Sequence, residues 1–218
     1  MEKDSFDAEG GPIHISFIGH GTLMLEHAGL VVHVDPVSAE ADYTALPKAD
    51  LILVTHEHSD HLDPKAIAAV RKQGTVMVLN PGAQAKLGEG TALANGESTS
   101  VLGIRIEALP AYNTTAGRDR YHPKGRDNGY LLTIGGKRIY IAGDTEVIPE
   151  MKALRNIDIA FLPMNQPYTM TPQQVAEAAR AFRPRILYPY HYSNTNTAEL
   201  VELLKGEKDI EVRIRKLD

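Results

Sequence analysis

Four side chains that could bind metal ions fall within six consecutive residues, 56–61, which read HEHSDH. In extended backbone alternate side chains point to the same side, so His56 and His58 can reach one ion. A turn after His58 lets Asp60 and His61 face a second ion, and two ions about 3.5–4 Å apart can share one hydroxide as a nucleophile. Imidazole and carboxylate suit Zn, Mn or Fe, of which we favour Zn. The segment therefore predicts a site for two divalent metal ions.

The residues around this segment predict the elements that would position it. Residues 51–55 form an apolar run that is typical of a strand buried on both faces. A helix is expected after Asp63, which suits an N-cap, with Pro64 in the first turn. A second helix is expected after Thr171, where the sequence TPQQ is typical of a capping box. Much of the remaining chain consists of short apolar segments between turn residues, which favours strands.

The composition limits the class of protein. The chain has 218 residues, a formal net charge of −5, 43% hydrophobic residues and no cysteine. This balance is typical of a globular domain and disfavours a nucleic-acid binder that works through bulk positive charge. Disulfides and cysteine-ligated zinc are excluded. No run of about 18 apolar residues is present, so we expect no membrane-spanning helix.

The first twelve residues are polar and acidic and contain no apolar core of a secretory signal. We expect residues 1–12 to form a flexible tail, followed by a single domain over residues 13–218. The lack of cysteine and of a signal fits a cytoplasmic protein, and a processed form of an exported protein is the alternative.

Further candidate ligands stand in a recognisable order along the chain. Asp144 follows an apolar segment in the sequence IAGDT, and His191 follows another in YPYHY. Together with HEHSDH, this order resembles the metal motif of the metallo-β-lactamase fold superfamily. The turn GHGT at 19–22 and the DP pair at 35–36 resemble a lactonase-like branch, which includes ascorbate-6-phosphate lactonase and N-acyl-phosphatidylethanolamine phospholipase D. The resemblance extends over about residues 13–215.

The resemblance implies an α+β fold, a four-layer αββα sandwich in which two mixed sheets face each other and helices cover their outer faces. Asp144 would be a carboxylate that bridges the two ions, and His191 would be the last histidine ligand. Asp35 would support a ligating histidine. His20 would lie at the rim, where it could contact the substrate or the leaving group. Tyr168, in the segment before the capped helix, is a candidate for contact with the site or the substrate.

One position departs from the pattern of the family. The family places another metal-binding histidine between the first motif and the bridging aspartate, and Asn113 stands there in this sequence. His122 is the only histidine between His61 and His191. Either His122 folds back from its loop to complete the first metal site, or Asn113 or a water molecule takes the position and weakens it. We favour His122, since imidazole binds these metals better than an amide.

These residues predict a metal-dependent hydrolase that uses a metal-bound hydroxide, and the resemblance implies a lactone, an ester or a phosphodiester as its substrate. Asp60 would hold the second ion and orient the water, and His20 could protonate the leaving group. The alternative, prompted by Asn113, is a metal- or ligand-binding protein whose site is degraded and does not hydrolyse. A di-iron oxidoreductase on this fold is disfavoured, because such enzymes place a glutamate where His58 stands.

The expected partner is a small-molecule substrate rather than a nucleic acid. Residues 110–128 form a long polar segment whose basic side chains either remain in solvent or close over an anionic substrate. These side chains are Arg118, Arg120, Lys124 and Arg126. The tyrosines within 188–192 could line the pocket or a contact between copies of the chain, so a homo-oligomer is compatible with the sequence.

Overall fold

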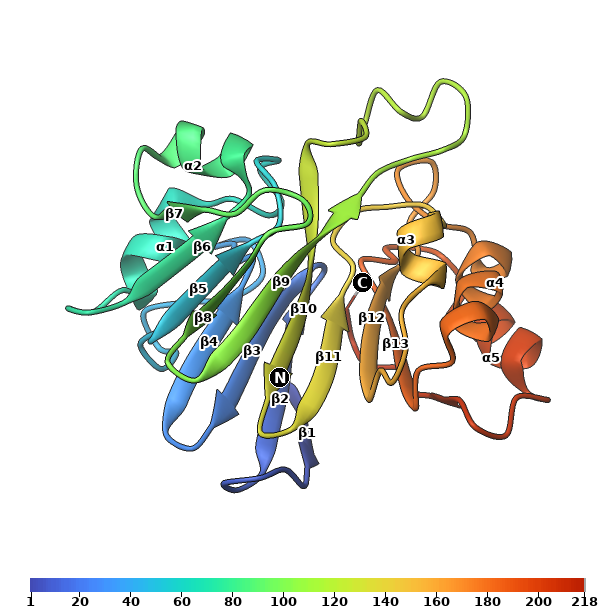
Figure 1. The fold of residues 1–218 in the computed structure, drawn as a ribbon, viewed down its shortest axis with the longest axis horizontal. Helices are drawn as coiled ribbons and strands as arrows, with labels where there is room; N and C mark the ends of the chain where they lie inside the picture. The colour runs from blue at the N-terminus through green and yellow to red at the C-terminus, as the bar shows by residue number, and fades with distance from the viewer. Residues whose placement is uncertain (218) are drawn as a thin grey trace.

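Two seven-stranded sheets form the centre of the computed structural model, which describes residues 1–217 (Figure 1). The first sheet follows the order of the sequence: β1 (Glu2–Phe6), β2 (Ile13–Gly19), β3 (Thr22–His27), β4 (Leu30–Val34), β5 (Leu51–Val54), β6 (Val76–Leu79) and β7 (Thr91–Ala92). The second sheet contains β8 (Ser98–Val101), β9 (Ile104–Ala111), β10 (Asp127–Ile134), β11 (Lys137–Ile141), β12 (Ile159–Pro163), β13 (Ile186–Tyr190) and β14 (Glu211–Val212). Both sheets are mixed, since β4–β7 and β11–β14 pair in parallel and the other neighbours pair antiparallel.

Alternating side chains of the strands fill two hydrophobic cores. In β5, Leu51 and Leu53 belong to the core between the two sheets. Ile52 and Val54 belong to the core on the outer face of the first sheet, together with apolar side chains of α1. Each such side chain contributes about 1.5–3 kcal/mol when it is fully buried. The predicted strand over 51–55, apolar on both faces, is therefore confirmed, and it provides a rigid support for the residues that follow it.

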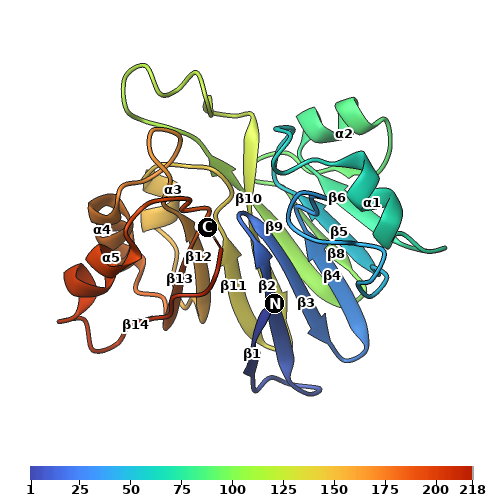
Figure 2. The same cartoon turned by 180° about the vertical axis from the view of Figure 1, so that it is seen from behind.

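Helices cover the outer faces of the sheets (Figure 2). The first sheet carries α1 (Pro64–Val70) and α2 (Pro81–Leu87), and the second carries α3 (Pro149–Lys152), α4 (Pro172–Phe182) and α5 (Thr197–Leu204). Asp63 caps α1 by accepting a hydrogen bond from the backbone N–H of Lys65, and Thr171 forms the predicted capping box of α4. The four-layer αββα arrangement is confirmed. Over residues 1–217, no helix is both long enough and apolar enough to span a membrane.

The expectation of a flexible tail over residues 1–12 is wrong. Residues Glu2–Phe6 form β1, which pairs antiparallel with β2. The carboxylate of Asp4 accepts hydrogen bonds from Arg215 at 2.7 Å, from Arg213 at 3.2 Å and from the hydroxyl of Tyr188. These contacts join the start of the chain to its end. This strand is held by backbone hydrogen bonds and ion pairs. Its sequence is polar, and so it contains no alternation of apolar residues by which a strand could have been predicted.

Loops that follow strand ends gather at one edge of the two sheets. β11 and β13 both pair in parallel with β12, so the segments after them leave the same edge of the second sheet, and the segment after β5 in the first sheet meets them there. HEHSDH follows β5, Asp144 follows β11, and His191 follows β13. His20 lies in the turn between β2 and β3, and His122 lies in the long loop between β9 and β10 at the top of Figure 1. The fold therefore brings side chains from five separate segments to one place.

Candidate metal centre

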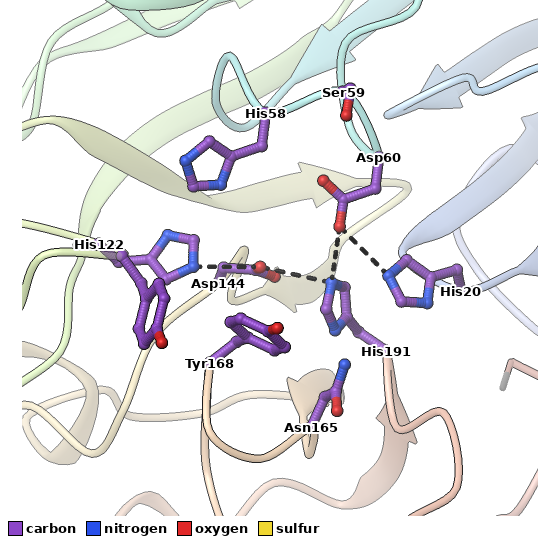
Figure 3. Close-up of a pocket in the computed structure, with 10 residues that line it drawn as sticks. His20, His58, Ser59, Asp60, His122, Asp144, Asn165, Tyr168 and His191 are labelled. Atoms are coloured by element: carbon purple, nitrogen blue, oxygen red, sulfur yellow. Dashed lines mark ion pairs between the residues drawn. The ribbon is translucent and has the colours of Figure 1, made fainter. Parts of the chain in front are cut away.

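The predicted ligands converge in three overlapping groups, in each of which the ligand atoms lie within 4.8 Å of one another. The groups are His56, His58 and His122; His20, Asp60, His61 and His191; and His56, His61 and Asp144. Because the third group shares a histidine with each of the others, the three form one continuous cluster. Figure 3 shows the part of this cluster that faces the pocket.

Asp144 lies at the centre of the cluster. Its Oδ2 is 3.3 Å from His191 Nε2, 3.4 Å from His122 Nε2 and 3.9 Å from His56 Nε2. Its Oδ1 is 3.5 Å from His61 Nε2. A single buried carboxylate thus faces imidazoles of both the first and the second group, which is the placement expected of a ligand shared by two ions.

The donor atoms of the cluster fit divalent metal ions. Within residues 1–217, His61 Nε2, His191 Nε2 and Asp144 Oδ1 are buried and have no hydrogen-bond partner. Leaving a buried polar atom unpaired costs about 1–3 kcal/mol, so three such atoms facing each other need an explanation. Nitrogen and oxygen ligands about 2.0–2.1 Å from one tetrahedral zinc ion lie about 3.4 Å apart, which is close to the separations around Asp144.

Asp35 and Thr55 fix the orientation of two histidines from behind. Asp35 Oδ2 accepts hydrogen bonds from His61 Nδ1 at 2.8 Å and from the Thr55 hydroxyl at 2.6 Å. Since that hydroxyl has only one hydrogen, its oxygen is left to accept from His56 Nδ1, which lies 3.0 Å away. In the neutral form that metal binding requires, both rings therefore carry their proton on Nδ1 and present Nε2 to the centre of the cluster.

Asp127 performs the same task for His122, and the sequence analysis missed it. Asp127 Oδ2 accepts a hydrogen bond from His122 Nδ1 at 2.8 Å, so that His122 Nε2 faces Asp144. Arg126 Nε donates to Asp127 Oδ1 at 2.6 Å and holds the carboxylate in place. Asp127 follows His122 by only five residues, but its role depends on how the loop folds back, which local spacing does not reveal.

Burial and the neighbouring charges together shift the pKa values of the ionisable groups. Burial lowers the pKa of His56, and the positive field of His61 lowers it further. Burial by itself would lower the pKa of His61 as well, but the carboxylates of Asp144 and Asp35 outweigh it and raise that pKa well above its usual value. Burial would raise the pKa of Asp144, yet His191 and His61 bring it well below its usual range. The central carboxylate is therefore ionised, as a metal ligand must be.

The backbone is strained at three residues of the site. His20, Asp35 and His191 have φ angles of 48°, 44° and 48°, in the left-handed region that side chains other than glycine rarely adopt. Such strain persists only where surrounding contacts enforce it, and it concentrates at functional sites. Here the backbone N–H of His191 donates to the carbonyl of His20 at 3.0 Å. Gly21 allows the close approach, since a Cβ there would lie 2.8 Å from His61 Cε1.

The cluster opens into a pocket of about 420 Å³. Asp60 lies on its open side, with its side chain 49% exposed and its Oδ2 3.5 Å from His191 Nε2. His20 lies at the rim with Nε2 3.4 Å from the same Asp60 oxygen. Tyr168 and Asn165 border the pocket on the side opposite His58 and Ser59 (Figure 3). The pocket therefore places an open approach next to the histidines and both carboxylates.

Asn113 lies beside the cluster but uses its amide for other contacts. Its Nδ2 donates to the carbonyl of Tyr168 at 2.7 Å and to that of Arg118 at 3.2 Å. Its backbone N–H donates to the carbonyl of His122 at 2.9 Å. Of the two alternatives left open by the sequence, the structure brings His122 into the group with His56 and His58, whereas Asn113 does not line the pocket.

Glu146 anchors the long loop that carries His122, and the sequence analysis did not identify it. Its fully buried carboxylate accepts hydrogen bonds from the backbone N–H of Thr114 at 2.7 Å and of Thr115 at 2.6 Å. Arg118 donates to its other oxygen at 3.3 Å. Glu146 follows Asp144 by two residues, so one short segment supplies the central carboxylate and also orders the loop that supplies His122.

Comparison with known proteins identifies the family of this chain. Residues 14–191 match the family model described as a beta-lactamase superfamily domain. A protein of Thermococcus kodakarensis, named a UPF0173 metal-dependent hydrolase, is 32% identical over 194 residues, which cover 83% of this chain and 85% of that protein.

Solved structures show the same fold. A protein of Parabacteroides distasonis whose name gives it as a metal-dependent hydrolase is 58% identical to this chain. The two structures superpose with a TM-score of 0.97 over 100% of this chain and 99% of that one. Igni18, a metallo hydrolase of Ignicoccus hospitalis, is 24% identical and has a TM-score of 0.78 over 94% of this chain and 95% of that one. At this identity the similarity shows only that the two proteins share a fold. The lactonase-like branch stays a prediction. Since the family model matches most of the chain, the protein belongs to the metallo-β-lactamase superfamily.

Proposed function

We propose that the chain is a metal-dependent hydrolase that holds two divalent ions, for which zinc is best suited. The ligands of the first ion would be His56, His58 and His122, and those of the second Asp60, His61 and His191. The observation that carries this proposal is the buried Asp144 carboxylate, which faces histidines of both sets. Relatives named as metal-dependent hydrolases support the same activity.

Two ions bound there would lower the pKa of a water ligand from 15.7 to about 7 and polarise an oxygen of the substrate. The chain's own residues would direct this chemistry. Asp35 and Asp127 accept from Nδ1 of His61 and His122 and so turn the Nε2 atoms of both rings inward. Asp60 Oδ2 lies 3.4 Å from His20 Nε2 and would orient the His20 ring at the rim of the pocket. His20 would donate a proton to the leaving group.

The substrate is inferred to be a lactone or ester, or a phosphodiester, of small-molecule size. A pocket of about 420 Å³ is within the range of small-molecule sites. The resemblance to the lactonase-like branch supports this choice of bonds. The alternative of a degraded binding protein rested on Asn113, and it loses that support because His122 joins His56 and His58.

The test compares protein stripped of metal by a chelator with the same protein reloaded with Zn or Mn. The substrates are a γ-lactone, a carboxylic ester and bis(p-nitrophenyl) phosphate. We expect turnover only in the reloaded protein, and its loss in Asp60→Asn but not in the matched control Asp42→Asn, whose carboxylate is exposed away from the pocket. Equal turnover in stripped and reloaded protein would contradict metal dependence. Metal binding without turnover on any of the three would favour the binding protein instead.

A further inference from the structure

Two tyrosines from different loops form one wall of the pocket. Tyr121 belongs to the loop between β9 and β10, and Tyr168 belongs to the loop between β12 and α4. Their ring centroids are 5.0 Å apart and the rings are nearly perpendicular, at 73°. This edge-to-face arrangement is one that aromatic pairs prefer. Although it contacts Tyr121, Tyr168 remains 44% exposed, so it leaves an open aromatic surface beside the cluster of ligands.

Hydrogen bonds from neighbouring residues hold this wall in place. Asn113, which is 4% exposed, donates its side-chain amide to the carbonyls of Tyr168 and Arg118 and so ties the two loops together. Arg126 Nη2 donates to the carbonyl of Tyr121 at 2.7 Å. The two rings are therefore carried on ordered backbone, and they lie next to His122, whose carbonyl accepts from Asn113. A pre-organised wall loses little entropy when a ligand packs against it.

Most of the basic side chains near the wall are paired with acidic residues of the chain. None of the loop's four basic side chains lines the pocket, and within residues 1–217 no Lys or Arg does. Arg118 pairs with Glu146, Lys124 with Glu150 and Arg126 with Asp127, whereas Arg120 packs over the ring of Tyr121, which carries no formal charge. The predicted alternative of a basic lid over an anionic substrate finds no cation among the described residues that line the pocket. The pocket offers the aromatic surface of the wall and the uncharged polar side chains of Ser59 and Asn165.

We propose that Tyr121 and Tyr168 determine specificity by packing against an uncharged aromatic or other planar apolar group of the substrate, next to the bond that is cleaved. Asn113 is the positioning residue that sets the distance between the two loops. This inference rests on the proposed hydrolase function, since it names the part of the substrate that the hydrolase recognises.

Three methyl esters with the same leaving group test the proposal. They are methyl phenylacetate, methyl butanoate and monomethyl succinate, which offer an aromatic, an aliphatic and an anionic acyl group. We expect the metal-loaded protein to have its highest kcat/KM for methyl phenylacetate. Tyr168→Ala should lower that kcat/KM about fivefold to tenfold more than it lowers the value for methyl butanoate, mainly through KM. Tyr168→Phe, which keeps the ring, should retain the preference.

Two further variants complete the kinetic test. Asn113→Ala should also raise KM for the aromatic ester more than it changes kcat, as expected of a residue that positions the wall. Leu102→Ala is the matched control, because Leu102 is 49% exposed in the turn between β8 and β9 and does not line the pocket. It should leave the preference as it is. A preference for monomethyl succinate, or an unchanged ratio of aromatic to aliphatic kcat/KM in Tyr168→Ala, would overturn the proposal.

A binding measurement separates this inference from the proposed function. The probe is 2-phenylacetamide, an uncharged amide that resists hydrolysis, and its binding is followed by NMR of the probe in wild type and in Tyr168→Ala. Binding that depends on Tyr168, without hydrolysis of any ester, would support the wall and refute the hydrolase. Ester hydrolysis without binding of the probe or preference for its ring would refute the wall alone. Absence of both would overturn both.

Discussion

Replacing Asp127 by asparagine removes the charge behind one predicted metal ligand and keeps its shape. Asp127 is fully buried and accepts from His122 Nδ1 at 2.8 Å and from Arg126 Nε at 2.6 Å. An asparagine has one acceptor oxygen, so either His122 or Arg126 loses its partner. The guanidinium of Arg126, which lies 3.3 Å from His58 Nε2, then keeps only Glu57 as an acidic partner beside the first group of ligands.

Loss of a carboxylate that orients a ligating histidine typically weakens metal binding 10- to 100-fold, or about 1.4–2.7 kcal/mol. We expect a loss of this size at one of the two sites in Asp127→Asn. The assay is a competition titration of zinc between the protein and a chromophoric chelator, fitted with two sites. Asp35→Asn should weaken the other site, because Asp35 orients His61.

The matched control is Asp158→Asn, which removes the same charge from a partly buried carboxylate that accepts from the backbone N–H of Arg138 and does not line the site. It should leave both zinc affinities unchanged. If Asp127→Asn is folded by circular dichroism and binds two zinc ions with affinities within about twofold of the wild type, the role given to Asp127 is refuted.

Three further variants test the loop, the start of the chain and the pocket. Glu146→Gln should lower the free energy of unfolding by about 1–3 kcal/mol and speed amide hydrogen exchange over residues 114–121, and unchanged exchange there would contradict the anchor. Burial raises the pKa of Asp4, but the hydrogen bonds from Tyr188 and Arg215 outweigh it and bring that pKa below its usual 3.8. The stabilisation of the fold by ionised Asp4 is therefore present above pH 3.8 and is lost as the pH falls through the folded-state pKa. Urea unfolding should therefore show Asp4→Asn about 1–2 kcal/mol less stable than wild type at pH 7, with a difference that shrinks as the pH falls below 3.8, and a constant difference would contradict this. Asp60→Asn should abolish turnover with an unchanged circular dichroism spectrum, and retained activity would contradict the function given to Asp60.

The sequence predicted those parts of the fold that local patterns determine. The buried strand over 51–55 was evident because its side chains are apolar on both faces, and the α4 cap at Thr171 was evident because capping requires particular residue types at fixed spacing. The helix α2 was missed although Asn80 caps it and Pro81 begins it, because Gly82 made the segment resemble a turn. Gly82 has a tertiary reason, since a Cβ there would lie 2.5 Å from an oxygen of Glu57.

In the candidate site, too, the residues placed by local sequence were predicted and those placed by tertiary contacts were missed. HEHSDH, Asp144 and His191 could be recognised because each follows a strand directly, so local sequence determines where it lies. The supporting carboxylates of Asp127 and Glu146 could not, because their partners are brought to them by a loop that returns to the site over more than ten residues. For the same reason the choice between Asn113 and His122 depended on the path of the loop.

Metal content is the most direct test of the central claim. The protein is purified without added metal or chelator, reloaded with Zn or Mn, freed of unbound ions, and measured by mass spectrometry for ions per chain. The account predicts about two ions per chain in the wild type, and about one in His122→Ala, which removes a ligand of the first group only. No bound ion after reloading, or two ions in both proteins, would contradict it.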